Sequence, residues 1–153
     1  MTALILKVEK KINADSTRLF RAWLKPDDFA KWFLAEDTIG FESVRIDPRP
    51  GGQFQINMLL NGQVLPHSGE YITIEEPNKL VFTWKSHMTD ERDTLVTVLF
   101  QELPPTINKD NLPKPQTLIT LTHERLTEDF QIKEHSRGWT NILEGLDQWL
   151  GKE

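Results

Sequence analysis

Two histidines near the C-terminal end of the chain have the residue type and the surroundings that could do chemistry. His135 lies on the apolar stripe of a helix predicted over residues 132–150, one turn before Trp139. His123 lies on a strand predicted over residues 116–125, where alternation points it inward or toward the edge. Burial lowers the pKa of a histidine because charging the ring in a low dielectric is costly. A neutral imidazole can orient a ligand carbonyl or act as a base. The simpler interpretation of His135 is a bond to a backbone carbonyl.

Glu70 and Tyr71 are neighbours on a predicted middle strand and therefore face opposite sides of the sheet. The hydroxyl of Tyr71, the only tyrosine of the chain, needs a hydrogen-bond partner if it is buried. Alternation along the strand places Glu70 on the inner face, where a buried carboxylate is costly unless Arg45 or Arg49 pairs with it. The simpler alternative for Glu70 is an exposed carboxylate.

A metal site built on the two histidines would need a third ligand from the protein. Glu124 directly follows His123 and so points to the opposite face of its strand, and the chain has no cysteine. We therefore expect no metal. Residues 50–52 lack the lysine and the spacing of a phosphate-binding loop, and no serine lies in a nucleophile elbow. We expect no cofactor.

The elements that must position these residues follow from the hydrophobic periodicity. Residues 4–12 alternate and predict a strand, and two short helices joined at Pro26 follow it. The prolines in residues 103–115 predict a long, stiff, irregular loop. Further strands are predicted before the last helix, over residues 41–47, 54–60, 68–75, 79–86, 94–102 and 116–125. Successive strands with short turns imply an antiparallel sheet covered by helices on one side, an α+β fold.

Apolar side chains on the inner face of the predicted sheet and helix can both fill the core and line a cavity. The sequence pattern does not separate these two roles. Besides Glu70, Tyr71, His123 and His135, the candidates for contact with a ligand are Phe54, Ile56, Met58, Phe82, Trp84, Val98, Trp139, Ile142 and Leu146.

The bulk properties of the chain exclude several classes of protein. Residues 1–153 are long enough for one domain and show no internal repeat. The formal net charge of −5 argues against nucleic acid as a partner, because phosphate binding requires a basic surface. No apolar run approaches the roughly 18 residues of a membrane-spanning helix, and no signal peptide is recognisable. The absence of cysteine fits the cytoplasmic location that we expect.

Several segments of the chain, taken in order, resemble one protein family. They are LFRAWLKPDDFAKWF (19–33), DPRPGGQF (47–54), GEYITIEEPNKLVFTW (69–84), TLVTVLF (94–100) and TLTHERL through HSRGWTNILEGLDQWL (120–150). They are similar to the domain named for the activator of the ninety-kilodalton heat-shock protein ATPase. That domain belongs to the START-like, or SRPBCC, superfamily, which includes the birch pollen allergen. The resemblance implies a helix-grip fold, in which a curved antiparallel sheet wraps around a long C-terminal helix and encloses a cavity.

The resemblance leaves three functions open. The first, which we favour, is a stand-alone START-like domain that binds a small hydrophobic molecule in the cavity. Relatives in the superfamily bind sterols, lipids, hormones or polyketides. The second is a chaperone-linked domain that stimulates or modulates a heat-shock-protein ATPase. The third is a cyclase- or hydrolase-type enzyme that uses His135, His123 or Tyr71 as an acid or base. We expect a binding protein, monomeric or homodimeric, rather than an enzyme.

One departure from the family bears on the second function. The family's eukaryotic co-chaperone carries a separate N-terminal domain that contributes much of chaperone binding and ATPase stimulation. The present chain begins at the family's first strand, so we expect it to lack that domain. ATPase activation therefore transfers less readily than the fold.

Overall fold

One antiparallel sheet of seven strands, in the order β1-β7-β6-β5-β4-β3-β2, organises the protein. The computed structural model describes residues 4–33, 39–107 and 109–150. The elements along the chain are β1 (Leu4–Ile12), α1 (Ser16–Ala22), α2 (Pro26–Trp32), β2 (Ile39–Ile46), β3 (Gln53–Leu60), β4 (Gln63–Glu75), β5 (Lys79–Trp84), the 3-10 helix η1 (His87–Thr89), β6 (Thr94–Ile107), β7 (Pro113–Leu126) and α3 (Asp129–Leu150).

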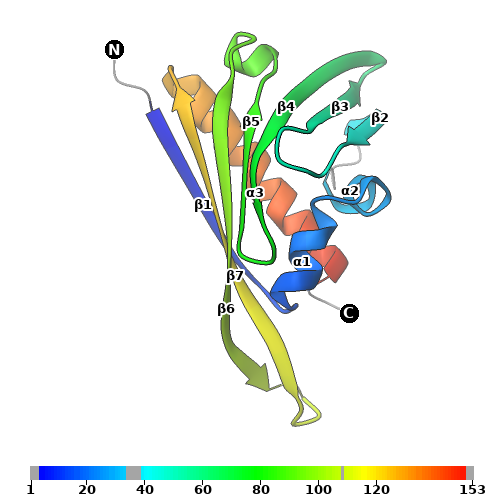
Figure 1. Ribbon diagram of the computed structural model, residues 1–153, viewed down its shortest axis with the longest axis vertical. Coiled ribbons are helices and arrows are strands. Elements are labelled where there is room, and N and C mark those ends of the chain that lie inside the picture. The colour runs from blue at the N-terminus through cyan, green and yellow to red at the C-terminus, as the bar shows by residue number, and fades with distance from the viewer. Residues whose placement is uncertain (1–3, 34–38, 108, 151–153) are drawn as a thin grey trace.

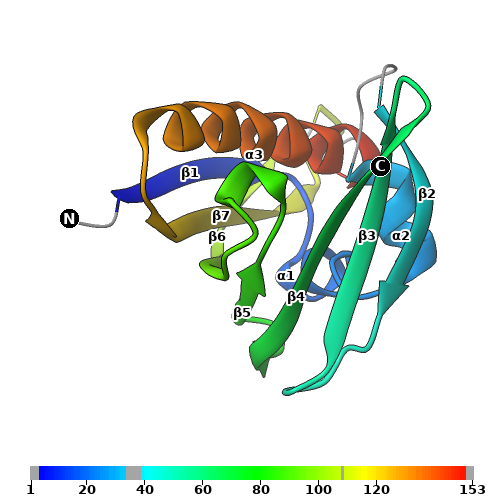
Figure 2. The same ribbon diagram turned by 90° about the horizontal axis from the view of Figure 1, so that it is seen from above.

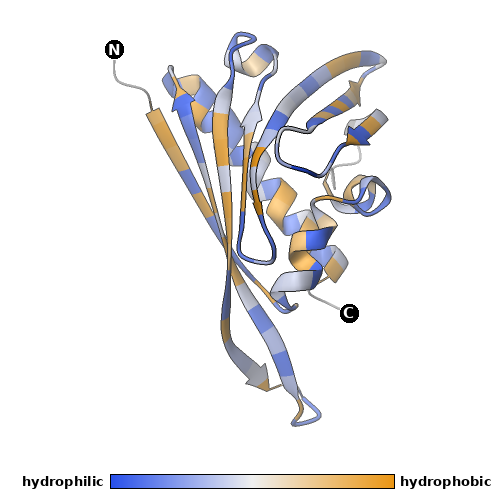
Figure 3. Ribbon diagram, viewed as in Figure 1, coloured by the Kyte–Doolittle hydropathy of each residue, from blue (hydrophilic) through white to orange (hydrophobic). Residues whose placement is uncertain are grey.

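The sheet curves around the long helix α3, which confirms the predicted α+β helix-grip fold (Figures 1 and 2). Seen from above, β1, β7 and β6 run beneath α3, and β2, β3 and β4 stand beside its C-terminal end (Figure 2). Apolar and polar residues alternate along β1, as a half-buried strand requires (Figure 3). The side chains of α1, α2 and α3 meet those of the sheet in one hydrophobic core.

The two short helices begin and end at the signals that the sequence provides. The carboxylate of Asp15 accepts a hydrogen bond from the backbone N–H of Arg18 at 2.9 Å and caps α1. Pro26 occupies the first turn of α2, where its missing N–H costs nothing. The aromatic residues Trp23 and Phe33, at the C-terminal caps of these helices, and Phe29, in the middle of α2, are buried.

Helix α3 starts at Asp129, three residues before the apolar stripe on which its prediction rests. The side-chain oxygen of Gln131 accepts a hydrogen bond from the backbone N–H of Thr127 at 2.9 Å. This polar contact connects the first turn of α3 to the end of β7. Hydrophobic periodicity does not predict such a contact, so it does not predict the start of the helix. Within the stripe, His135, Trp139 and Leu146 are buried, as predicted.

Strand β4 joins the two halves of the sheet. Its first part pairs with β3 up to Glu70, and its second part pairs with β5 from Tyr71 onward. At the crossing, a Cβ atom on Gly69 would collide with the carbonyl oxygen of Thr83 and the ring of Phe54. Gly69 therefore allows the backbones of β4 and β5 to approach each other closely.

The prediction of an irregular loop over residues 103–115 is wrong. Strands β6 and β7 continue as a two-stranded ribbon, with Ile107 opposite Pro113 (Figure 1). The register is irregular between Leu103 and Thr106, where two prolines lie. Most of the ribbon lies beyond the ends of the neighbouring strands β1 and β5, so the proline positions do not need N–H groups for a third strand.

Candidate ligand-binding site

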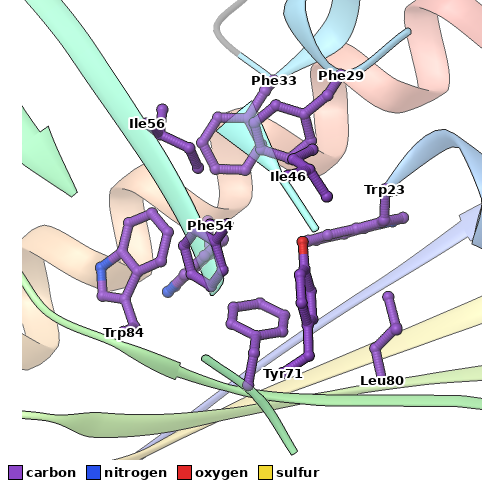
Figure 4. A pocket seen from close by; sticks show the side chains of 11 residues that line it. Trp23, Phe29, Phe33, Ile46, Phe54, Ile56, Tyr71, Leu80 and Trp84 are labelled. Atoms are coloured by element: carbon purple, nitrogen blue, oxygen red, sulfur yellow. The ribbon is translucent and has the colours of Figure 1, made fainter. Parts of the chain in front are cut away.

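An aromatic pocket lies where α1, α2 and strands β2 to β5 meet α3 (Figure 4). The cavity left between its side chains has a volume of about 20 Å³, enough for about one water molecule. It is much smaller than a typical ligand pocket of roughly 300–1,000 Å³. The side chains that line it are Trp23, Phe29, Phe33, Ile46, Phe54, Ile56, Tyr71, Leu80, Phe82, Trp84 and Trp139.

Tyr71 and Trp23, two of the residues that line this apolar pocket, each carry a polar group. The hydroxyl of Tyr71 points into it, on the side where Trp23 lies (Figure 4). Burial, with a smaller contribution from Asp47, raises the pKa of the Tyr71 hydroxyl, which therefore keeps its proton at neutral pH. Within the described chain, the Nε1–H of Trp23 is the one buried side-chain nitrogen or oxygen group without a hydrogen-bond partner.

Two other buried tryptophans, Trp32 and Trp139, have hydrogen-bonded indole nitrogens. The Nε1–H of Trp32 donates to the carbonyl oxygen of Ala22 at 3.0 Å. The Nε1–H of Trp139 donates to Nδ1 of His123 at 3.0 Å. An unpaired buried donor costs roughly 1–3 kcal/mol, so the Trp23 nitrogen is a site where an acceptor would stabilise the protein.

His123 is held by hydrogen bonds at both ring nitrogens. Because Nδ1 accepts from Trp139, the proton lies on Nε2, which donates to Oγ1 of Thr94 at 2.7 Å. Thr94 in turn donates to the carbonyl oxygen of Trp84 at 2.6 Å. Burial, with the nearby His135, lowers the pKa of His123 to about 3. The ring is a neutral link between α3 and the sheet, and neither nitrogen is free to act as a catalytic base.

His135 forms a hydrogen bond to a backbone carbonyl, as the simpler of the two interpretations predicted. Its Nδ1–H donates to the carbonyl oxygen of Gln131 at 2.8 Å. Its ring centroid lies 4.8 Å from that of His123. Burial is the main cause that lowers the pKa of His135, against the opposing effects of Gln131 and Glu134.

The other two histidines belong to the same region, which the sequence did not indicate. The ring of His67 on β4 lies 5.1 Å from Trp84 and 6.3 Å from His87. Its Nδ1 contacts the carbonyl oxygen of Leu65 at 3.0 Å. Burial lowers the pKa of His67 to about 4, with a smaller effect of His87 and His135. Alternation would indicate His67 only if Tyr71, four residues later, were assigned to the inner face, where the sequence pattern instead places Glu70.

The comparisons with known proteins agree with this architecture. The sequence profile of the family described as "Activator of Hsp90 ATPase homolog 1-like protein" matches residues 13–151. The chain belongs to this family. None of the curated proteins matches the chain.

Solved structures of similar fold extend over almost the whole chain. Protein CV1439 from Chromobacterium violaceum is 18% identical with a TM-score of 0.79, and the match covers 96% of each chain. PFC0360w from Plasmodium falciparum, described as an HSP90 activator, is 19% identical with a TM-score of 0.67 and covers 95% of this chain and 94% of its own. CalU16 from Micromonospora echinospora is 22% identical with a TM-score of 0.64 and covers 94% and 74%. At these identities the likeness shows the fold alone.

In this member of the Hsp90-activator-like family, the predicted site residues separate into three groups. Phe54, Ile56, Tyr71, Phe82, Trp84 and Trp139 line the pocket. Glu70 is exposed, which agrees with the simpler alternative, and its placement on the inner face by alternation is wrong. The remaining candidates are buried but do not line the pocket: Met58, Val98, His123, His135, Ile142 and Leu146.

The physical reason for the error at Glu70 is an irregularity in the strand. The pairing of β4 with β5 shifts between Tyr71 and Thr73, so the alternation does not continue across it. Ile72 is consequently 48% exposed. Arg49, one of the two partners considered for Glu70, instead pairs with Asp47 at 2.9 Å.

The helices contribute pocket residues that the sequence-based list omitted. Trp23, Phe29 and Phe33 were recognisable as apolar faces of short helices, but their position over the cavity depends on how the helices pack. Ile46 and Leu80 complete the lining. Among the described residues, no group of three or more His, Asp or Glu side chains could hold a metal ion. No helix in the same part of the chain is long and apolar enough to cross a membrane.

Proposed function

We propose that this protein binds a small, largely apolar molecule in the aromatic pocket. The observation that supports it is the packing of large side chains from α1, α2, β2–β5 and α3 around a space that none of them fills. Close-packed protein interiors contain few voids. A void between the sheet and its helices that is lined almost entirely by carbon atoms suits an apolar ligand.

A ligand larger than water must displace part of the pocket wall, and α2 is the part with the weakest local support. Asp15 caps α1, whereas Lys25 at the N-cap of α2 makes no side-chain capping bond. A helix of seven residues depends on packing for its stability. Phe29 and Phe33, whose rings stack with centroids 4.1 Å apart, form the wall that α2 carries. An outward movement of α2 would therefore widen the pocket and leave the sheet in place.

Fluorescence titration with the neutral probe N-phenyl-1-naphthylamine tests this function. We expect saturable binding of one probe per chain. Leu80→Phe adds bulk to the pocket and should weaken binding roughly tenfold or more. Leu99→Phe, the same substitution at an exposed position of β6, is the matched control. Phe29→Ala removes a wall residue and should strengthen binding.

The outcomes of the titration are distinct. Equal binding by the wild type, Leu80→Phe and Phe29→Ala would place the probe elsewhere on the protein and contradict the proposal. Absence of binding to the folded wild type would also contradict it. Thermal unfolding of each variant checks that the fold is intact.

A second candidate function is interaction with a heat-shock chaperone. It is supported by the family and by exposed apolar side chains outside the pocket, Ile107 at 66% and Leu112 at 57% exposure on the β6–β7 ribbon. A contiguous exposed apolar patch marks a surface for protein contacts. The test is the ATPase rate of the ninety-kilodalton heat-shock protein from the same organism, with and without the chain. Stimulation by the wild type that is lost in the double variant Ile107→Ser, Leu112→Ser would support this function. An ATPase rate that the wild-type chain leaves unchanged would contradict it.

A further inference from the structure

We propose that the ligand of the aromatic pocket is neutral and carries a hydrogen-bond acceptor, such as a carbonyl oxygen, that the Trp23 indole N–H and the Tyr71 hydroxyl recognise together. This inference rests on the proposed function and adds the chemical class of the ligand. Ketones, aldehydes and esters with an apolar body belong to this class.

The position of Trp23 leaves its donor few ways to be satisfied. The side chain is only 3% exposed, so bulk water does not reach the nitrogen freely. Its ring packs edge-to-face on Trp32 at a centroid distance of 4.9 Å, and Phe82 and Phe100 lie at 6.5 Å. These neighbours offer carbon and no acceptor that reaches the nitrogen. The cavity that Trp23 borders is therefore the place from which an acceptor can come.

The Tyr71 hydroxyl supplies a second polar contact in the same space. The ring of Tyr71 is fixed between Phe54, at a centroid distance of 5.4 Å, and Phe82, at 6.2 Å. Its hydroxyl points into the pocket, on the side where Trp23 lies (Figure 4). An indole N–H can only donate, whereas a phenol can donate or accept. A ligand atom shared by both groups must therefore be an acceptor.

The lining of the pocket also determines the charge of the ligand. No charged side chain is among the residues that line it. An ionised ligand would lose its hydration without gaining a countercharge, which is costly. A neutral molecule with one acceptor loses little hydration and replaces it with two hydrogen bonds. The cavity also has room for about one water molecule, which could occupy the same position between Trp23 and Tyr71.

A pair of isosteric probes tests whether the pocket recognises a hydrogen-bond acceptor. Acetophenone and α-methylstyrene differ only in a carbonyl oxygen against a methylene group. Their binding can be followed in ¹⁵N-labelled protein through the indole N–H signals of the five tryptophans, with Trp23 assigned from the variant Trp23→Phe. We expect the wild type to prefer acetophenone roughly tenfold. Acetophenone should move the Trp23 indole proton signal downfield, as formation of a hydrogen bond does.

Two variants test the residues, and one serves as a control. Tyr71→Phe removes only the hydroxyl, and Trp23→Phe removes the indole donor. In each, the preference for acetophenone should fall toward one. Trp149→Phe, at a half-buried tryptophan of α3 outside the pocket, should keep the wild-type preference. Because Tyr71→Phe conserves the ring, it remains informative even if Trp23→Phe does not fold.

Failure of this inference and failure of the proposed function give different results. If both probes bind equally and the Trp23 signal does not move, the pocket is a ligand site without acceptor recognition, and the inference is wrong. A preference that survives in both variants also overturns it. If neither probe binds, the site holds water only, and the proposed function fails together with the inference.

Discussion

Acid should destabilise this fold through its buried histidines at pH values well above those that protonate most carboxylates. Burial lowers the pKa of His67 to about 4 and that of His123 to about 3, and it also lowers the pKa of His135. The unfolded chain then takes up these protons first. Stability is therefore greatest above the ordinary histidine pKa of about 6.5 and falls as the pH drops from there toward the folded-state values.

The size of the effect follows from these shifts. Each histidine that stays neutral in the folded state lowers the free energy of unfolding by about 1.4 kcal/mol per pH unit below about 6.5. At pH 5, His67 and His123 therefore cost about 2 kcal/mol each, or about 4 kcal/mol together. His135 adds to the loss in the same direction. The total is a large part of the roughly 5–15 kcal/mol that stabilises a typical domain.

Urea unfolding at pH 7, 6 and 5, followed by tryptophan fluorescence, measures this slope. In the variant His67→Asn the side-chain amide can replace the Nδ1 contact with the Leu65 carbonyl oxygen. The slope should then decrease by the contribution of one histidine, about 1.4 kcal/mol per pH unit. His87→Asn, the same substitution at the exposed histidine beside His67, is the matched control. A wild-type free energy of unfolding that is equal at pH 7 and pH 5 would refute the reasoning.

Three further predictions concern the sheet and its attachment to α3. Trp139→Phe leaves Nδ1 of His123 buried without its donor and should lower the free energy of unfolding by about 1–3 kcal/mol in urea at pH 7; an unchanged value would mean that the bond is not formed. Gly69→Ala places a methyl group against the Thr83 carbonyl oxygen and should cost about 1–3 kcal/mol or more, which thermal unfolding measures; an unaltered melting temperature would contradict the close approach of β4 and β5. Backbone amides of the ribbon over residues 103–115 should exchange with deuterium faster than those of β6 inside the sheet, as mass spectrometry or NMR can show; equal protection would indicate that the ribbon is covered.

The periodic parts of the fold were predictable from the sequence. The stripe of α3 repeats over five turns, so a few polar interruptions do not hide it, and His135 falls on its buried side as expected. The sequence does not predict the ribbon, because prolines are usually typical of strand ends and loops. They end a strand only where a neighbour needs the N–H group, and the sequence does not show where neighbouring strands stop.

The pocket was only partly predictable, for two physical reasons. A shift in pairing at Tyr71 reverses the faces that alternation assigns to Glu70 and Ile72, and such a shift depends on the neighbouring strand. Which buried side chains border a cavity is decided by packing at the scale of one methyl group. Phe54 and Met58 are therefore alike by sequence pattern, although only Phe54 lines the cavity.

The two-stranded ribbon has a consequence for how the length of this chain can vary. Its cross-strand bonds are internal to β6 and β7, and none of the described residues 103–107 and 109–115 lines the pocket. Removing or adding one residue on each strand beyond Leu103 preserves the pairing, and neither the body of the sheet nor the cavity changes. A single unmatched insertion instead forces a bulge or reverses the faces of every residue that follows it up to the turn. Natural length differences at this point should therefore come in even numbers of residues, and the exposed tip formed around Ile107 and Leu112 would move outward in steps of one residue pair.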